Sequence, residues 1–292
     1  MGTDASDRMI ARSSPEIPRH IFSVDVEDYF QVSAFESIAP MSTWDDRPSR
    51  VERNTYRLIE LLSEQNTGAT FFTLGWVAKK FPALVRAIVD AGHEVASHSY
   101  WHRRVTTMTP ESFRTDLRQS KTILEQVSGH PVIGFRAPSF SIVAGVEWAW
   151  EILAEEGFLY DSSVFPIRRP GYGNPGSPRE PYTQQAGQHT LKQFPLATAT
   201  FGGVPFPAAG GAYLRLLPLA LVHAALRDAA NRGVPAMCYI HPWEIDPDQP
   251  RLDVGPLTRL RHYGGLARVE KRLQQLFNAY RFTSVRQYLA GA

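Results

Sequence analysis

The sequence has no long hydrophobic run, no pair of cysteines and no strong excess of either charge. No segment approaches the roughly 18 uninterrupted apolar residues of a membrane span, and residues 1–18 lack the apolar stretch of a signal peptide. The single cysteine, Cys238, excludes an internal disulfide framework. A net charge of +2 gives no reason to expect nucleic acid or a membrane surface as a partner. We expect a cytoplasmic protein with a disordered lead over residues 1–18.

The apolar content of 43% is enough for a sizeable core, and no repeat or low-complexity tract divides the chain. We therefore expect residues 19–292 to form one domain. Strand-like segments alternate with helical ones as far as residue 161, which predicts a parallel sheet, either doubly wound or closed as a barrel. The residues from 167 to 187 are rich in proline and glycine and are expected to form an irregular surface excursion. A strand is predicted again at residues 236–240.

Residues capable of chemistry follow most of the predicted strands. In parallel α/β folds the carboxyl ends of strands meet at one edge, where sites form. Five strand ends of this kind are hard to assign to chance. The residues are Asp25, Glu27 and Asp28 after the first strand, His98 and His102 after the third, and Arg136, Asp161 and His241 after later ones.

The pair His98 and His102 has the four-residue spacing that places two imidazoles on one face of a helical turn. Two histidines and one carboxylate with open coordination positions form a common hydrolytic metal site. Two surface histidines would give the same spacing. The acids after the first strand favour the metal site, because a cation would offset the cost of burying them.

Several motifs together resemble the polysaccharide deacetylases with the NodB homology domain, carbohydrate esterase family 4. They span about residues 19–245 and are Ser-Val-Asp-Val-Glu-Asp from Ser23, His98-Ser-x-x-His102, Arg136-Ala-Pro-Ser-Phe140, Tyr160-Asp-Ser-Ser-Val-Phe-Pro166 and Tyr239-Ile-His-Pro-Trp-Glu244. The segments Ser49-Arg-Val-Glu-Arg-Asn-Thr55 and Gly210-Gly-Ala-Tyr-Leu-Arg-Leu-Leu-Pro218, with the C-terminal segment from about residue 246, resemble a subgroup associated with exopolysaccharide and exosortase loci.

The resemblance implies a distorted (β/α) barrel, often of seven strands, and a divalent metal, usually zinc. The family's first motif commonly reads Thr-Phe-Asp-Asp, where the first Asp is the base and the second a metal ligand. Here Val26 follows Asp25, so the carboxylate ligand is Glu27 or Asp28. Residues two apart on an extended chain share a face, which favours Glu27 beside Asp25. His98 and His102 would complete the metal site.

The resemblance also implies roles in the hydrolysis of an N-acetyl group. Asp25 would take a proton from water, and His241 would give one to the leaving amine. Arg136 would keep Asp25 ionised, although a structural ion pair would look the same in sequence. Asp161 would either orient His241 or cap a turn. Trp101, Phe140 and Trp243 would form walls against a sugar, although core aromatics are more frequent.

The expected substrate is an N-acetylated polysaccharide, either an exopolysaccharide or its precursor. Two alternatives remain open. One is an amidase acting on a small cyclic imide or ureide, which the Asp-x-Glu form of the first motif allows. The other is an inactive carbohydrate-binding module, which would not need both a base and an acid. The sequence leaves the oligomeric state undecided.

Overall fold

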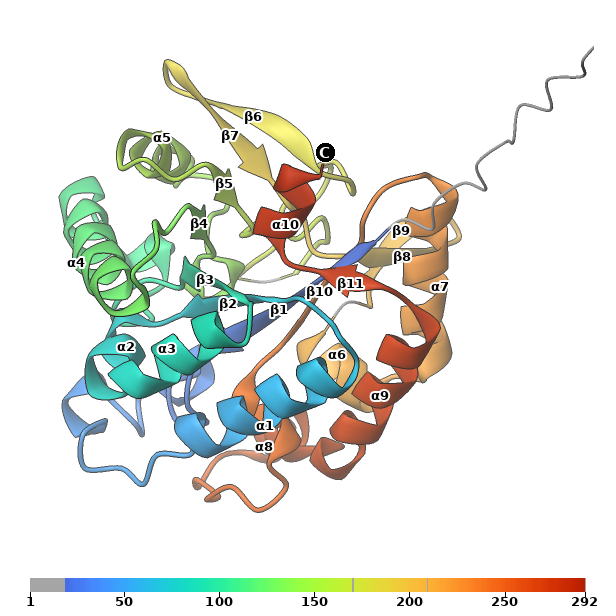
Figure 1. The fold of residues 1–292 in the computed structure, drawn as a ribbon, viewed down its shortest axis with the longest axis horizontal. Helices are drawn as coiled ribbons and strands as arrows, with labels where there is room; N and C mark the ends of the chain where they lie inside the picture. Colours follow the sequence, from blue (N-terminus) through green and yellow to red (C-terminus); the bar gives the residue numbers. More distant parts are fainter. Residues whose placement is uncertain (1–18, 170, 209, 292) are drawn as a thin grey trace, which may run out of the picture.

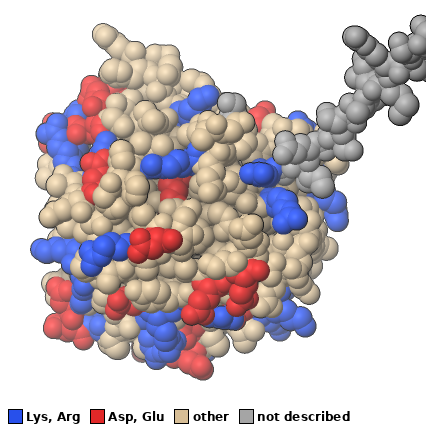
Figure 2. All heavy atoms as spheres, in the orientation of Figure 1, with Lys and Arg blue, Asp and Glu red and all other residues tan. Residues whose placement is uncertain are grey.

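The computed structural model describes residues 19–169, 171–208 and 210–291, so the predicted lead over residues 1–18 lies outside the described residues. The fold is α/β, and its centre is a curled, mainly parallel sheet (Figure 1). No helix within the described residues is long and apolar enough to cross a membrane. Lysine and arginine alternate with aspartate and glutamate over the face in Figure 2, so neither sign dominates there.

Seven strands run parallel in one sheet, in the order β10-β1-β2-β3-β4-β5-β7. Strand β6 adds an antiparallel edge beside β7, and the short β11 pairs with the start of β1. The bounds are β1 His20–Val26, β2 Thr70–Thr73, β3 Glu94–Ser97, β4 Gly134–Phe135, β5 Tyr160–Asp161, β6 Tyr182–Ala186, β7 His189–Gln193, β10 Met237–Ile240 and β11 Phe282–Thr283. The strands β8 (Thr198–Phe201) and β9 (Val204–Pro207) form a separate hairpin.

The sheet curls until the chain after β7 reaches the opposite edge. Leu196 forms a single parallel bridge to Met237 of β10, and the amide of Ala197 donates to the carbonyl of Met237 at 3.0 Å. The interior of the curl is filled by side chains of alternate strand residues, including Ile21, Phe72 and Tyr160. The predicted distorted (β/α) barrel is confirmed as a curled, half-barrel parallel sheet.

Helices cover the outer face of the sheet, and α4, α2, α3, α1 and α9 follow one another around it in Figure 1. Their bounds, with those of the remaining helices, are α1 Val51–Glu64, α2 Gly75–Lys80, α3 Pro82–Asp90, α4 Pro110–Ser128, α5 Trp148–Glu155, α6 Gly211–Leu216, α7 Leu219–Asn231, α8 Pro256–Tyr263, α9 Val269–Ala279 and α10 Val285–Ala290.

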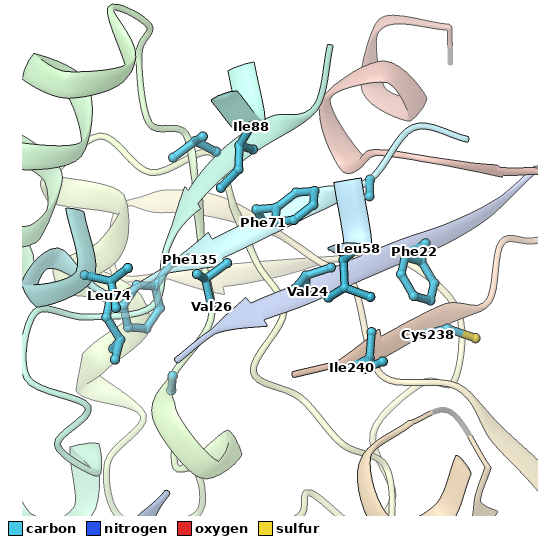
Figure 3. Close-up of a cluster of buried hydrophobic side chains, with 14 of the residues drawn as sticks. Phe22, Val24, Val26, Leu58, Phe71, Leu74, Ile88, Phe135, Cys238 and Ile240 are labelled. Carbon is cyan, nitrogen blue, oxygen red and sulfur yellow. The ribbon is translucent and has the colours of Figure 1, made fainter. Parts of the chain in front are cut away.

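Strand β1 lies in the middle of the sheet and is buried along its whole length. Its even-numbered residues Phe22, Val24 and Val26 point towards the covering helices, where they contact side chains such as Leu58 of α1 and Ile88 of α3 (Figure 3). Because side chains alternate along a strand, Ser23 and Asp25 point to the other side, into the curl. This alternation places the carboxylate of Asp25 at the site.

Candidate active site

The carboxyl ends of β1, β3 and β10 and the loop after β4 surround a cavity of about 280 Å³. The side chains predicted from the strand ends gather here in part. Asp25, Glu27, His98, His102, Phe140 and His241 all line this cavity. The adjacent wall consists of Val32, Ser33, Ala34, Ser139, Tyr172 and Tyr239.

Glu27, His98 and His102 form a buried cluster in which one ligand atom of each lies within 4.8 Å of the others. The Nδ1 of His98 lies 2.8 Å from the carbonyl oxygen of Arg136, so it carries the proton and donates, and Nε2 is left with a free lone pair. Oε2 of Glu27 lies 2.6 Å from Nε2 of His102 but accepts no hydrogen bond from the described residues. One carboxylate and two imidazoles arranged in this way fit a divalent cation such as zinc.

The electrostatics of the cluster favour a charged Glu27 carboxylate beside a neutral His98. Burial would raise the pKa of Glu27, but the nearby His102 and His241 outweigh it and lower this pKa to about 2. Burial lowers the pKa of His98 to about 4. An anionic carboxylate and a neutral imidazole are the forms that bind metal.

The segment from His98 to His102 is an irregular loop rather than the expected helical turn. Ser99 and His102 have positive φ angles of 68° and 54°, which turn the chain back so that both imidazoles face the cavity. The buried carboxylate of Asp116 on α4 holds the loop by accepting from the amides of Tyr100 (2.8 Å) and Trp101 (3.3 Å). No pattern in the sequence predicts this support.

Asp25 and Arg136 form a buried ion pair next to the cluster. Nη1 of Arg136 donates to Oδ1 of Asp25 at 2.6 Å and to the hydroxyl of Ser23 at 2.9 Å. The rest of the guanidinium donates to Ser162, which follows β5. Nε of Arg136 donates to the carbonyl of Ser162, and Nη2 donates to its hydroxyl. Arg136 is fully buried over the ring of Phe72, so its charge is directed at Asp25.

His241 lies across the cavity from this pair, with its Nε2 at 3.9 Å from Oδ2 of Asp25 and 3.6 Å from Oε1 of Glu27. Its Nδ1 is 2.6 Å from Oε1 of Glu244, and the other oxygen of Glu244 accepts from Nε of the buried Arg215 at 2.7 Å. Burial would lower the pKa of His241, but the carboxylates of Glu27, Glu244 and Asp25 raise it to about 9. The three carboxylates therefore favour the protonated form of His241.

Asp28 is buried but lies outside the cluster. Its carboxylate accepts from the hydroxyl of Ser49 and from the amides of Arg50 (2.9 Å) and Val51 (3.2 Å), and so provides acceptors at the start of α1. Of the two candidate carboxylate ligands, only Glu27 faces the histidines. Strand β1 ends at Val26, and the amide of Glu27 donates to the carbonyl of Asp25 at 3.0 Å, which closes a tight three-residue turn there.

Asp161 is also buried away from His241. It accepts from the amide and hydroxyl of Ser163 and from Nε1 of Trp150, and the Ser163 hydroxyl accepts from the amide of Ala137. Of the two roles considered for Asp161, the structure shows the turn cap. The partner of His241 is instead Glu244, three residues further along the same motif. That spacing within His-Pro-Trp-Glu is the signal that could have revealed it.

The three predicted aromatic walls occupy different places. Phe140 lines the central cavity, whereas Trp101 lines an adjoining hollow of about 210 Å³ together with Trp44 and His102. Trp243 is buried behind His241, stacked between the rings of His241 and His262. It therefore supports His241 and presents no face to the cavity, contrary to the expected sugar contact.

A curled parallel α/β sheet with a His-His-carboxylate cluster at its carboxyl edge is an architecture suited to metal-dependent hydrolysis. Residues 36–153 match the family described as polysaccharide deacetylase, and residues 162–290 match a family described as a domain of unknown function (DUF3473). The chain thus carries a polysaccharide deacetylase domain of the NodB and carbohydrate esterase family 4 type, followed by a DUF3473 segment. Because β7 and β10 belong to that segment, it completes the central sheet.

This chain matches only part of the length of its curated relatives. A peptidoglycan-N-acetylglucosamine deacetylase from Bacillus cereus is 31% identical over 110 residues, which are 37% of this chain and 39% of that protein. A peptidoglycan deacetylase from Helicobacter pylori is 30% identical over 129 residues, 41% of this chain and 42% of that protein. The matched region therefore spans well under half the length of these relatives.

Solved structures share the fold along almost the whole chain. A putative polysaccharide deacetylase from Mycobacterium smegmatis superposes with a TM-score of 0.64 at 22% identity, covering 96% of this chain and 92% of that one. A Puue allantoinase superposes with a TM-score of 0.58 at 17% identity, covering 92% and 88%. At these identities the likeness concerns the fold alone.

Proposed function

We propose that this protein is a metal-dependent hydrolase that removes N-acetyl groups from amino sugars of a polysaccharide. The observation that carries the proposal is the joint placement of three units around one cavity. They are the Glu27–His98–His102 cluster, the Asp25–Arg136 pair and His241. A metal ligand set, a base and an acid are the groups that amide hydrolysis requires.

Two histidines and a glutamate leave open coordination positions, which favours zinc in a catalytic rather than a structural site. When bound there, a zinc ion would polarise the acetyl carbonyl and make a water molecule more acidic. Glu27, His98 and His102 would hold the ion. Asp28 would contribute only through the stability of α1.

The residues of this chain would move the protons. Asp25 would accept a proton from the attacking water, and Nη1 of Arg136, at 2.6 Å from Oδ1, holds the Asp25 carboxylate in place. As the carbon–nitrogen bond breaks, His241 donates a proton from Nε2 to the leaving sugar amine, and acetate is released. The contact between Nδ1 of His241 and the carboxylate of Glu244 supports this role, because it raises the pKa of the imidazole and leaves Nε2 to act as the donor.

The shape of the site favours a polymer over a small cyclic ureide. Hollows adjoin the central cavity on two sides, one at His102 and Trp101 and another at Tyr172 and Tyr239. A chain of sugars would occupy several such hollows, whereas a single small ring needs only the centre. The likeness to an allantoinase concerns the fold and gives no support to ureide hydrolysis. The finer proposal is an exopolysaccharide or its precursor.

The proposal is tested by acetate release from N-acetylglucosamine oligomers and N-acetylated polysaccharides, using zinc-loaded protein. We expect release by the wild type and a loss of at least about 100-fold in Asp25→Asn, with unchanged zinc content and unchanged thermal unfolding. If the zinc-loaded protein opens cyclic ureides and releases no acetate from any saccharide, the amidase alternative replaces this one. Saccharide binding without hydrolysis would instead indicate a binding module.

A further inference from the structure

A second hollow of about 440 Å³ adjoins the candidate active site, and Tyr172 and Tyr239 form the wall between the two. Every residue that lines this hollow lies within residues 162–290, the DUF3473 segment. Tyr213 and Leu216 of α6 are among them. A polymer that extends from the central cavity past Tyr172 would enter this hollow.

The sequence motif that begins at Gly210 builds the hollow. A Cβ atom at Gly210 would lie 2.0 Å from the main-chain oxygen of Tyr239, and one at Gly211 would lie 2.8 Å from the hydroxyl of Tyr239. Only glycines let α6 approach β10 this closely. The close approach brings Tyr213 to the hollow, where its hydroxyl lies 2.9 Å from that of Tyr172.

The hollow has a positive rim and no carboxylate. Arg169 and Arg261 both line it, and neither forms an ion pair with any residue that the structure describes. The Arg169 guanidinium carbon lies 5.8 Å from the centre of the Tyr213 ring. Burial raises the pKa of Tyr172, and the positive charges of Arg169 and Arg261 oppose this rise.

An aromatic wall with two free guanidinium groups matches one kind of ligand. Aromatic and aliphatic side chains contact the C–H faces of a sugar ring, as in other largely apolar ligand sites. A guanidinium group binds a carboxylate through two parallel hydrogen bonds, which gives both affinity and orientation.

We propose that this hollow binds an acidic sugar, a ring bearing a carboxylate, linked to the N-acetylated sugar in the central cavity. This inference rests on the proposed deacetylase function and specifies its substrate as an anionic heteropolysaccharide. Arg169 and Arg261 bind the carboxylate, while Tyr213 and Leu216 contact the ring. The DUF3473 segment would thereby select the polymer, while the residues of the central cavity hydrolyse the amide.

The test compares two substrates of equal length on zinc-loaded protein. One is an oligosaccharide of alternating N-acetylglucosamine and glucuronic acid, and the other is an N-acetylglucosamine oligomer. We expect kcat/KM for acetate release to favour the acidic substrate by at least about tenfold. In the double variant Arg169→Gln/Arg261→Gln, the ratio of acidic to neutral kcat/KM should fall by at least about tenfold. The matched control, Arg168→Gln, changes an exposed arginine that lines neither cavity and should keep the ratio.

A ratio that is the same in the wild type and the double variant would overturn the inference. A third substrate, an N-acetylglucosamine oligomer bearing a 6-phosphate, separates carboxylate from phosphate. If the double variant loses more activity on the phosphorylated oligomer than on the glucuronic acid oligomer, the ligand is not an acidic sugar.

A calorimetric titration keeps this inference separate from the proposed function. If no saccharide releases acetate, the deacetylase proposal fails. Tighter binding of the acidic oligosaccharide to the wild type than to the double variant would still support the acidic subsite. Equal binding to both proteins would contradict it.

Discussion

Oε2 of Glu27 lies 2.6 Å from Nε2 of His102, yet this buried oxygen accepts no hydrogen bond from the described residues. A buried carboxylate oxygen without a donor is costly, and natural structures rarely keep one without a reason. His98 points its own Nε2 towards the same space, because its Nδ1 donates to the carbonyl of Arg136. A divalent cation would stabilise lone pairs that converge in this way.

The first prediction separates the two neighbouring acids Glu27 and Asp28. Glu27→Gln removes the charge from the cluster, so zinc affinity should fall by at least about 100-fold while the protein stays folded. Asp28→Asn should keep zinc affinity. It should lower the free energy of unfolding by about 1–3 kcal/mol, because an amide nitrogen would replace either Oδ2, which accepts at the start of α1, or Oδ1, which accepts from the amide of Tyr29. Zinc titration and urea unfolding of both variants measure these effects, and zinc loss in Asp28→Asn alone would reverse the assignment.

The second prediction concerns the support of His241. Glu244 accepts from Nδ1 of His241 and from Arg215, so Glu244→Gln should leave the imidazole poorly oriented and less able to donate its proton. We expect kcat to fall by about 100-fold with little change in zinc content. Glu244→Asp, which keeps the charge, should recover part of the activity.

A control for the second prediction is Glu155→Gln, which changes an exposed glutamate paired with Arg114 on the outer surface. Its kcat should match that of the wild type. If Glu244→Gln and Glu155→Gln have equal kcat values, Glu244 does not position the acid.

The third prediction uses the pKa of Asp161. Burial raises this pKa from 3.8 to about 6, so between pH 4 and 6 the native protein binds more protons at this site than the unfolded chain does. The contribution of Asp161 to stability is present below about pH 4 and is lost as the pH rises through 6. It amounts to at most about 3 kcal/mol. Asp161→Asn removes this dependence, so the stability difference between the two proteins should change across that window.

Urea unfolding of both proteins at pH 4 and pH 7 checks the Asp161 prediction. Asp161→Asn should also keep kcat within a few-fold of the wild type, since Asp161 contacts Ser163 and Trp150 and not His241. A loss of kcat as large as that of Glu244→Gln would return Asp161 to the role of orienting the acid.

The sequence was informative wherever chemistry depends on strand alternation. Asp25 and Glu27 lie two residues apart at the end of β1, and both reach the cavity with His98, His102 and His241. The alternating strands and helices likewise predicted the parallel sheet. The alternation of strands and helices does not predict the curl of the sheet. The curl depends on the bridge between Leu196 and Met237, which are distant in the sequence.

Other features depended on partners far apart in the sequence. From the sequence alone Asp28 is a candidate metal ligand, whereas in the structure its carboxylate accepts hydrogen bonds at the start of α1. Asp116, which supports the His98–His102 loop, lies on the separate helix α4. The residues from 167 to 187 were expected to be irregular, yet β6 begins at Tyr182 and pairs with β7. Pairing with β7 makes this segment a strand, and the composition of the segment alone does not predict it.

The last prediction concerns Gly210, which lets α6 approach β10. In Gly210→Ala the new methyl group would meet the main-chain oxygen of Tyr239 at 2.0 Å, and a backbone atom cannot turn aside as a side chain can. We expect the free energy of unfolding to fall by about 1–3 kcal/mol. Displacement of α6 should also weaken the support of His241, because Arg215 lies on the same helix. Thermal and urea unfolding, with kcat measured well below the melting temperature, test both effects.

The matched control is Gly255→Ala, at a glycine with an ordinary φ of −59° and no atom within 4 Å of the added carbon. Its stability should stay within about 0.5 kcal/mol of the wild type. If Gly210→Ala is as stable and as active as Gly255→Ala, then α6 tolerates a wider separation from β10. In that case the glycines of this motif would not be what places Tyr213 and Arg215 beside the site.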